Sequence, residues 1–552
     1  MDVRDIAAQL NVDALLEGTI RIEDGRLRVT TQLTGAADGY SIWAASFERD
    51  INDKIQLQTE IAAEITRQLV PSLTNDVIHL KGVTANVKAQ DFYFLGRYHW
   101  HKRTPESLKQ AVDYFREAIK LDPEYALAYA GLSDALLFQT AYDNRTIEEV
   151  VADARNAVEK AIELEPQLAE TQASLGMLFE QTGDLERARE AYGRAIQLNP
   201  QNSMAHMWLG NVLREDADKS YYHYEQALKL DPLHPQVQYN YIESLMSLGR
   251  FDEAIRAMEQ FLKLNPHNLI INTMLEAKLQ IGDYDEVLRL AVGYNITDEN
   301  KPFLNDAVVE TLIHLQRFEE AEKMIRRGWE TMDPWQYGLL LAKLSVARRD
   351  PAGVKEVVEF LASPETRTRK NAIKEHNIYN ECIDVMASYL QGIATYLSGD
   401  YPGAINQFDT FFNTKSESIC YKLHFDTDIS ALLYQASAYL RSNTGADKAA
   451  EILTTAGTRL MDLRHLGWDT PDLALNQVAR YSLMNEQDKA VELLREMINR
   501  GWKPYGRLRM SPLLDDFRNY LASNKIQLPE LENEYQKVMN TCSNIGLAKL
   551  GL

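Results

Sequence analysis

Two histidines stand where a metal site would first be sought. His99 and His101 flank Trp100 in the stretch Gly96–Thr104. Side chains two residues apart on a helix point to different faces, so this spacing makes a poor chelate. We therefore expect packed or exposed roles for both histidines and no bound metal.

The three cysteines suggest no disulfide framework. They are too few and too widely separated for a set of bridges or a four-cysteine zinc site. Burial is the expectation for Cys382 and Cys420, with a regulatory thiol or disulfide as the alternative. Cys542 completes the set, and the redox role of all three stays open.

Sequence motifs for catalysis are absent. The chain has no glycine-rich phosphate loop, no dinucleotide fingerprint, no H-E-x-x-H and no G-x-S-x-G. Acidic pairs are abundant, but on helices of this composition they usually form a solvated face. We expect no cofactor and no enzyme activity, and an enzyme whose site carries no motif is the minor alternative.

Charge and hydropathy limit the classes of partner and the locations that the chain is expected to have. The 552 residues carry a net charge of −21, which disfavours nucleic acid or an anionic membrane as the main partner. No run of 18 apolar residues predicts a membrane span, and the start, Met1–Asp5, does not resemble a secretory signal. The default expectation is a cytoplasmic location, or a periplasmic one if a membrane-anchored effector region precedes this chain.

The sequence contains a repeat, and this repeat determines where its candidate functional residues lie. An apolar-acidic or apolar-amide phrase closes a helix before a proline, and it recurs at Pro123, Pro166, Pro200, Pro232 and Pro266. A second marker, a turn residue followed by a charge and a large apolar residue, begins at Gly183, Gly249, Gly282, Gln316 and Gly399. Most intervals are 32–34 residues, the period of two-helix repeats. A generic helical bundle is the alternative.

Residues 169–200 resemble a tetratricopeptide repeat. Leu175-Gly176 and Phe179 fall in the first helix, and Ala188, Tyr192 and Ala195 in the second. The resemblance implies a mainly α fold, a right-handed solenoid of helix hairpins. We expect a well-matched array over 90–300, degenerate helix pairs over 301–500 and a helical cap over 501–552.

The first helix of each hairpin should line an inner groove that takes a protein or peptide. Helical phase places Ala173 and eight further candidates on that groove: Met177, Gln181, Met207, Asn211, Arg214, Tyr239, Glu243 and Met246. A groove that clamps a terminal carboxylate needs several Lys, Arg and Asn side chains, and only Asn211 and Arg214 are present. The mixed lining instead favours an adaptable surface, and the net charge favours a cationic or amphipathic partner.

Residues 1–80 have a different pattern. Residues 26–33 alternate polar with apolar or β-branched side chains, which predicts a half-buried strand in a hairpin with 16–23. A third strand is expected at 41–49 and an amphipathic helix at 55–69. Leu10–Gly18, Ile42–Ala44 and Phe47–Arg49 resemble a TolB- or FlgO-like α/β domain whose upstream strand and helix are missing here.

The combination resembles regulators of the CadC-like and adenylate-cyclase-associated type. Gly96–Thr104 and Pro512–Arg518 also match that group. The resemblance implies a small partial α/β domain followed by a regulatory solenoid, behind an amino-terminal effector such as a winged helix or a cyclase. We expect a non-enzymatic scaffold, the sensory part of a bacterial signalling or transcription regulator; a free-standing adaptor for complex assembly is the alternative.

Overall fold

The amino-terminal strands form a small antiparallel sheet. The computed structural model describes residues 12, 14–23, 26–35, 41–50, 61, 84–142, 145–264, 268–294, 305–328, 334–364, 366, 376–416 and 425–545. Its strands are β1 (Ala14–Glu23), β2 (Arg26–Gly35) and β3 (Ser41–Asp50), in the order β1-β2-β3. The predicted hairpin and third strand are confirmed, whereas the helix expected at 55–69 lies almost wholly outside the described residues.

One face of the sheet carries the predicted alternation. Thr31 and Leu33 are buried, while Thr30 before them and Gln32 between them are exposed. On the same face, Val29 lies opposite Ile20 of β1, and Ile20 is 69% exposed. The apolar face of the sheet is therefore buried at the carboxyl end of β2 and exposed to solvent at Ile20 of β1.

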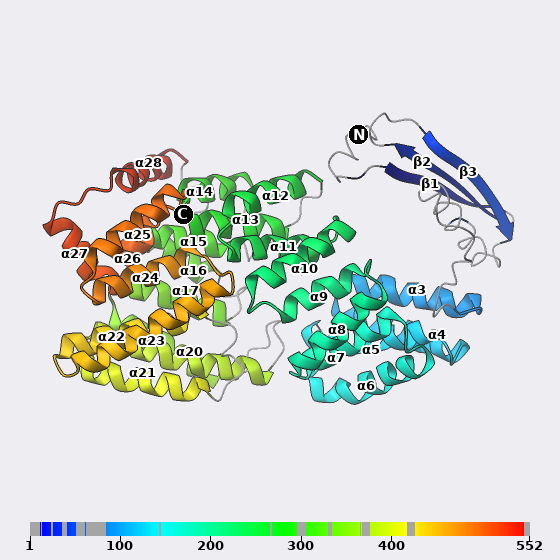
Figure 1. The fold of residues 1–552 in the computed structure, drawn as a ribbon, viewed down its shortest axis with the longest axis horizontal. Helices are drawn as coiled ribbons and strands as arrows, with labels where there is room; N and C mark the ends of the chain where they lie inside the picture. Colours follow the sequence, from blue (N-terminus) through cyan, green and yellow to red (C-terminus); the bar gives the residue numbers. More distant parts are fainter. Residues whose placement is uncertain are drawn as a thin grey trace. The chain divides into compact units, whose positions relative to one another are not determined.

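All remaining elements are helical. By compactness the chain divides into unit 1, residues 1–212 with 226–234, and unit 2, residues 213–225 with 235–552. The helices of unit 1 are α3 (Val87–His101), α4 (Pro105–Leu121), α5 (Ala126–Tyr142), α6 (Ile147–Leu164), α7 (Ala169–Gln181), α8 (Leu185–Leu198) and α9 (Ser203–Val212). Helix α10 (Ala217–Leu230) contributes to both units. Figure 1 shows these helices in cyan to green.

Unit 2 continues the series of hairpins. Its helices are α11 (Pro235–Ser247), α12 (Phe251–Leu264), α13 (Asn268–Ile281), α14 (Tyr284–Gly293), α15 (Asn305–His314), α16 (Phe318–Arg327), α17 (Pro334–Ala347), α18 (Pro351–Ala362), α20 (His376–Leu397), α21 (Tyr401–Ser416), α22 (Phe425–Ser442), α23 (Ala446–His465), α24 (Pro471–Leu483), α25 (Gln487–Asn499), α26 (Tyr505–Met510), α27 (Asp515–Ser523) and α28 (Pro529–Ile545), with a short 3₁₀ turn, η4 (Pro512–Leu514).

Small residues let the two helices of a hairpin approach closely. A Cβ added at Gly176 of α7 would lie 2.6 Å from the ring of Tyr192 on α8. Ala188 and Tyr192 are themselves fully buried. The same arrangement recurs where Gly96 meets Phe115 and Gly392 meets Phe408. The tetratricopeptide-like packing predicted for one repeat thus holds in both units.

The inter-helix turns have one backbone feature in common. The predicted turn residues Gly183, Gly249, Gly282, Gln316 and Gly399 all have positive φ, between 61° and 82°. Left-handed backbone ends the first helix abruptly, and the second helix then begins one or two residues later. Positive φ is costly for residues other than glycine, so the glycines in this marker have a conformational cause.

Unit 2 closes on itself, which an open superhelix would not do. The N–H of Lys503, after α25, donates to the carbonyl of Ile281 at 2.6 Å, and the N–H of Asp469 donates to Ser247 O at 2.8 Å. Helix α26 packs on α15, and α24 on α13; Figure 1 shows the orange helices beside the green ones. The turns of late hairpins therefore rest on the turns of early ones, and we call these contacts the seam.

Candidate binding groove

One position recurs in the first helix of successive hairpins. It lies six residues before the positive-φ turn residue and immediately after a buried position that packs on the second helix. In unit 1 it holds Arg97 and Met177, and in unit 2 it holds Glu243, Glu276, Glu310, Lys343, Ile393, Ser437 and Ala479. We call this series the ladder, because each of these hairpins contributes one residue to the same position on the inner face of its own unit.

The ladder of unit 1 starts with an ion pair. Arg97 NH1 of α3 lies 3.6 Å from Asp134 Oδ2 of α5, and the Arg97 guanidinium also covers the ring of Trp100 at 4.4 Å. Asp134 is 4% exposed. Burial raises the pKa of Asp134 to about 6, although Arg97 opposes this shift. The pair is thus held in a largely dry environment.

The two histidines considered from sequence have different neighbours. The His99 ring lies 5.2 Å from the Tyr114 ring, whereas His101 faces His234, with 6.5 Å between ring centroids. Burial, helped by Arg97, lowers the pKa of His101 to about 4. Within the described residues, no three His, Cys, Asp or Glu side chains are grouped as a metal site would need.

The sequence-predicted groove residues differ in burial. Met177, Met207 and Met246 are at most 4% exposed, so they contribute packing rather than open surface. Gln181, Asn211, Tyr239 and Glu243 are partly exposed, and Arg214 is exposed. In unit 2, Arg214 Nε donates to the Tyr224 hydroxyl at 3.2 Å and acts electrostatically on Tyr239 and Glu243, which brings three of the predicted residues together.

Carboxylates occupy three consecutive positions of the ladder in unit 2. Glu243, Glu276 and Glu310 are 33 and 34 residues apart, and Lys343 on α17 forms an ion pair with Glu310. Burial and the neighbouring Glu276 raise the pKa of Glu243 to about 7. Burial and Glu310 likewise raise the pKa of Glu276. The single lysine does not neutralise this row.

Two further side chains of α15, Asp306 and His314, interact electrostatically with these carboxylates. Burial raises the pKa of Asp306 to about 6, against a hydrogen bond from Gln336 that lowers it. His314 is 9% exposed, and its Nδ1 has no hydrogen-bond partner. Burial and then Arg507 lower the pKa of His314 to about 3, so the imidazole is neutral at physiological pH.

A cavity of about 400 Å³ opens beside this part of the ladder. Its charged lining is Glu310, Lys343, Asp472 and Arg507, and the neutral His314 also lines it. Arg507 NH1 pairs with Asp472 Oδ1 at 2.9 Å and also donates to the carbonyl of Gln280 at 3.3 Å. The remaining lining is mostly apolar and comes from α17, α20, α22, α24, α26 and η4. The volume lies within the usual range of ligand sites.

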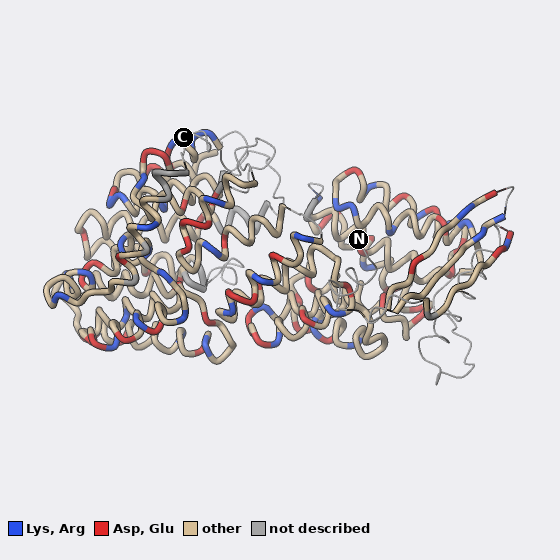
Figure 2. Tube along the Cα trace, turned by 90° about the horizontal axis from the view of Figure 1, so that it is seen from above, with Lys and Arg blue, Asp and Glu red and all other residues tan. Residues whose placement is uncertain are grey.

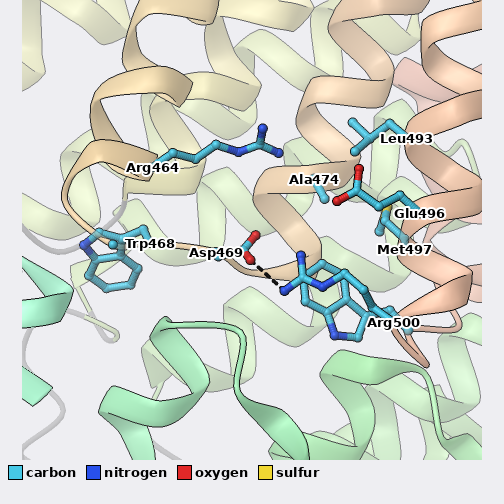
Figure 3. Close-up of a pocket in the computed structure, with 10 residues that line it drawn as sticks. Arg464, Trp468, Asp469, Ala474, Leu493, Glu496, Met497 and Arg500 are labelled. Carbon is cyan, nitrogen blue, oxygen red and sulfur yellow. Dashed lines mark hydrogen bonds and ion pairs between the residues drawn. The ribbon is translucent and has the colours of Figure 1, made fainter.

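A second, more polar pocket of about 290 Å³ lies next to the seam. Figure 3 shows Arg464 extending into it from α23, Glu496 reaching it from α25, and Arg500 reaching it from the residue that follows α25. Arg500 NH2 pairs with Asp469 Oδ2 at 2.6 Å and stacks on the Trp502 ring at 3.8 Å. These contacts hold the late turns in place, so we attribute a structural role to this pocket.

Sequence reasoning missed most of the charged ladder. Glu243 was placed on the inner face, and steps of 33–34 residues from it reach Glu276, Glu310 and Lys343. The repeat period was therefore a signal that could have found them. Arg507 and Asp472 carry no such signal, because closure of unit 2 brings them to the ladder from more than 150 residues away. The side chains of Cys382, Cys420 and Cys542 lie outside the described residues.

Comparison with known families agrees with the repeat geometry. Residues 178–216 match a TPR repeat model, and residues 211–279 match a second tetratricopeptide repeat model. Among solved structures, pilF of Pseudomonas aeruginosa is similar at 18% identity, over 38% of this chain and 89% of that one, with a TM-score of 0.29.

Curated relatives are distant and are matched only in part. A putative adenylate cyclase 3 of Rhizobium meliloti (strain 1021) is 26% identical over 24% of this chain and 23% of its own length. The transcriptional regulator HilA of Salmonella typhimurium is 21% identical over 48% of this chain and 42% of its own. The chain thus spans less than half the length of these relatives. The family models match tetratricopeptide repeats over residues 178–279, and the same hairpin packing recurs outside that range, so the helical part of the chain has the fold of a tetratricopeptide-like solenoid.

Proposed function

We propose that this chain is a protein-binding scaffold and forms the regulatory part of a bacterial signalling or transcription-regulator protein. The observation that carries the binding role is the ladder: one polar, partly exposed residue from each of several consecutive hairpins on a single face. Side chains that serve packing alone would be apolar at this position, as Met177 is. A row of polar groups offers a partner repeated hydrogen-bond and charge contacts.

The charge of the ladder favours a basic partner segment. In unit 2, Lys343 and Arg507 interact electrostatically with Glu276 and Glu310, whereas Glu243 interacts with Glu276 and Arg214. Carboxylates with raised pKa values gain most from a cation that a partner supplies. Lys and Arg residues are interspersed with Asp and Glu along the helices (Figure 2), so preference for a basic partner would come from the groove rather than from the whole surface.

The regulatory role rests on weaker support. Two curated relatives are named a putative adenylate cyclase and a transcriptional regulator. The three-stranded sheet ahead of the solenoid fits a partial TolB- or FlgO-like domain of CadC-like regulators. In this proposal, partner binding to the solenoid alters the stacking of hairpins, and this change is passed to the amino-terminal domain. Within the described part of the chain, no helix has both the length and the apolar character for a bilayer crossing.

A matched pair of charge reversals tests the binding role. Glu243→Lys changes the ladder on α11, whereas Glu253→Lys changes an outer position on α12 that pairs with Arg250. Affinity-tagged full chain, produced in its native host, is used to capture partners that mass spectrometry identifies. The proposal expects Glu243→Lys to lose a partner that the wild type and Glu253→Lys both retain. Equal capture by all three proteins would contradict a role for the ladder.

A further inference from the structure

The cavity beside the unit 2 ladder has a lining of two chemical kinds. Glu310, Asp472, Lys343 and Arg507 line it together with the buried His314. The rest of the lining is mostly apolar and includes Met386, Leu390, Leu475 and Met510, each less than 10% exposed. A ligand that fills this space needs an apolar body and a polar or charged head.

The charges around the cavity favour a ligand with a cationic head group. Lys343 and Arg507 already pair with Glu310 and Asp472. Glu276 and Asp306 interact electrostatically with the same groups and leave an excess of negative charge. A cation placed here would offset that excess, whereas a carboxylate would add to it.

His314 provides a separate indication of a missing partner. Its side chain is about nine-tenths buried, lines the cavity and has an Nδ1 atom without a hydrogen-bond partner. A buried polar atom of this kind normally finds a partner. Because the imidazole is neutral, one nitrogen can accept a hydrogen bond. The exposed surface of Nδ1 is below 1 Å², so the ring must turn slightly before an ammonium N–H in the cavity can donate to this atom. A bare metal ion fits less well, because the described residues contain no three-residue cluster of metal-ligating side chains.

We propose that this cavity binds a small organic amine, with its ammonium group between Glu310 and Asp472 and its apolar body among Met386, Leu475 and Met510. The occupant is a free small molecule rather than an extended peptide, because the cavity measures about 400 Å³, which is near the lower end for ligand sites.

This inference rests on the proposed function only in that the inner face binds ligands. Partner capture and amine binding are separate measurements on separate parts of the ladder. Loss of amine binding in the presence of normal partner capture would remove this inference and leave the scaffold proposal intact, and the reverse result would do the opposite.

Calorimetric titration of the full chain at pH 7.5 tests the proposal. The probes are 2-phenylethylamine and tryptamine, each compared with the carboxylate of similar size, 3-phenylpropionate and indole-3-propionate. We expect both amines to bind with Kd below about 1 mM, and both carboxylates to bind at least about tenfold more weakly. Equal affinity for amines and acids, or no binding of either amine, would overturn the proposal.

Substitutions localise the site. Glu310→Gln and Asp472→Asn should each weaken amine binding by about tenfold or more, since each removes a charged hydrogen-bond acceptor. Glu322→Gln is the matched control, because Glu322 pairs with Arg326 on α16 and with Arg348, which follows α17, rather than with the cavity residues. Circular dichroism confirms folding of each variant. Unchanged amine affinity in both cavity variants would place the ligand elsewhere.

A final arm separates a free amine from a basic peptide. A ten-residue peptide with one central lysine is titrated under the same conditions. The proposal expects this peptide to bind more weakly than tryptamine, because a ten-residue chain does not fit into a cavity of about 400 Å³. Tighter binding of the peptide, abolished by Glu310→Gln, would overturn the small-molecule assignment and assign the cavity to a protein partner.

Discussion

Replacing Glu243 with glutamine should stabilise the protein above neutral pH and leave it unchanged under acidic conditions. Burial and the nearby Glu276 raise the pKa of Glu243 from 4.5 to about 7. A carboxyl whose folded-state pKa is raised holds its proton more tightly in the folded chain than in the unfolded one. Its contribution to stability is therefore fully present below pH 4.5 and is lost as pH rises through about 7.

The magnitude follows from this difference in pKa. An isolated group with these two values would lose about 3 kcal/mol of unfolding free energy between acidic and mildly alkaline pH. Glu243 is partly exposed, and water in the groove reduces the effect, so we expect about 1–2 kcal/mol. Glutamine has nearly the same shape and never ionises. The Glu243→Gln variant should gain that amount at pH 8 and match the wild type at pH 4, below the ordinary pKa of 4.5.

Hydrogen-exchange mass spectrometry on peptides from α11 and α13 measures the local opening free energy directly. Glu253→Gln is the control, because a hydrogen bond from Arg250 lowers the pKa of Glu253. Folding therefore favours the ionised form of Glu253, so its replacement should give no gain in stability at pH 8. A Glu243→Gln variant that protects α11 equally at both pH values, or that loses protection at pH 8, would refute the reasoning.

Two glycine comparisons test the packing. Gly282→Ala should lower stability more than Gly399→Ala. Both glycines have φ near 80°, but only at Gly282 would an added Cβ overlap the backbone across the seam. Faster hydrogen exchange of residues 500–510 in the Gly282→Ala variant alone is the expected result, and equal exchange in the two variants would count against the seam. Gly176→Ala should lower stability by about 1–3 kcal/mol, because its Cβ would overlap Tyr192. Gly193→Ala, on the open side of α8, should leave the melting temperature unchanged or raise it. A similar loss of stability in both variants would argue against close helix packing.

The repeat architecture was predictable because local rules determine it. Glycine at a left-handed turn, such as Gly249, and small residues at a helix crossing, such as Ala188, act within one hairpin of about 34 residues. The strand alternation around Thr31 and Leu33 is equally local. Each of these features has a direct steric cause, so the sequence pattern carries it.

Closure of unit 2 was not predictable from the repeat. The pattern suggested an open superhelix, since each hairpin contacts its neighbours and no local signal links distant turns. Closure depends on small rotations accumulated over many hairpins and on contacts such as Lys503 N–H to Ile281 O. The same limitation hid the cavity, because Asp472 and Arg507 reach Glu310 only through that closure.

Burial was the second source of error in reasoning from helical phase. Met177, Met207 and Met246 share the face of Tyr239 and Glu243 in projection. The structure nevertheless buries the methionines against neighbouring helices. Helical phase specifies a direction but not how far the next hairpin extends over it, so polar residues at the ladder position are better guides to an open groove than apolar ones.

Site-specific photo-crosslinking tests most directly whether the inner face binds a partner. A photoreactive benzoylphenylalanine replaces Tyr239, which is partly exposed on α11, or Glu259, which is exposed on the outer helix α12. After irradiation in the native host, we predict a discrete protein adduct at position 239 that is absent at position 259 and is lost on Glu243→Lys substitution. Adducts at position 259 alone, or identical adducts at both positions, would contradict the account.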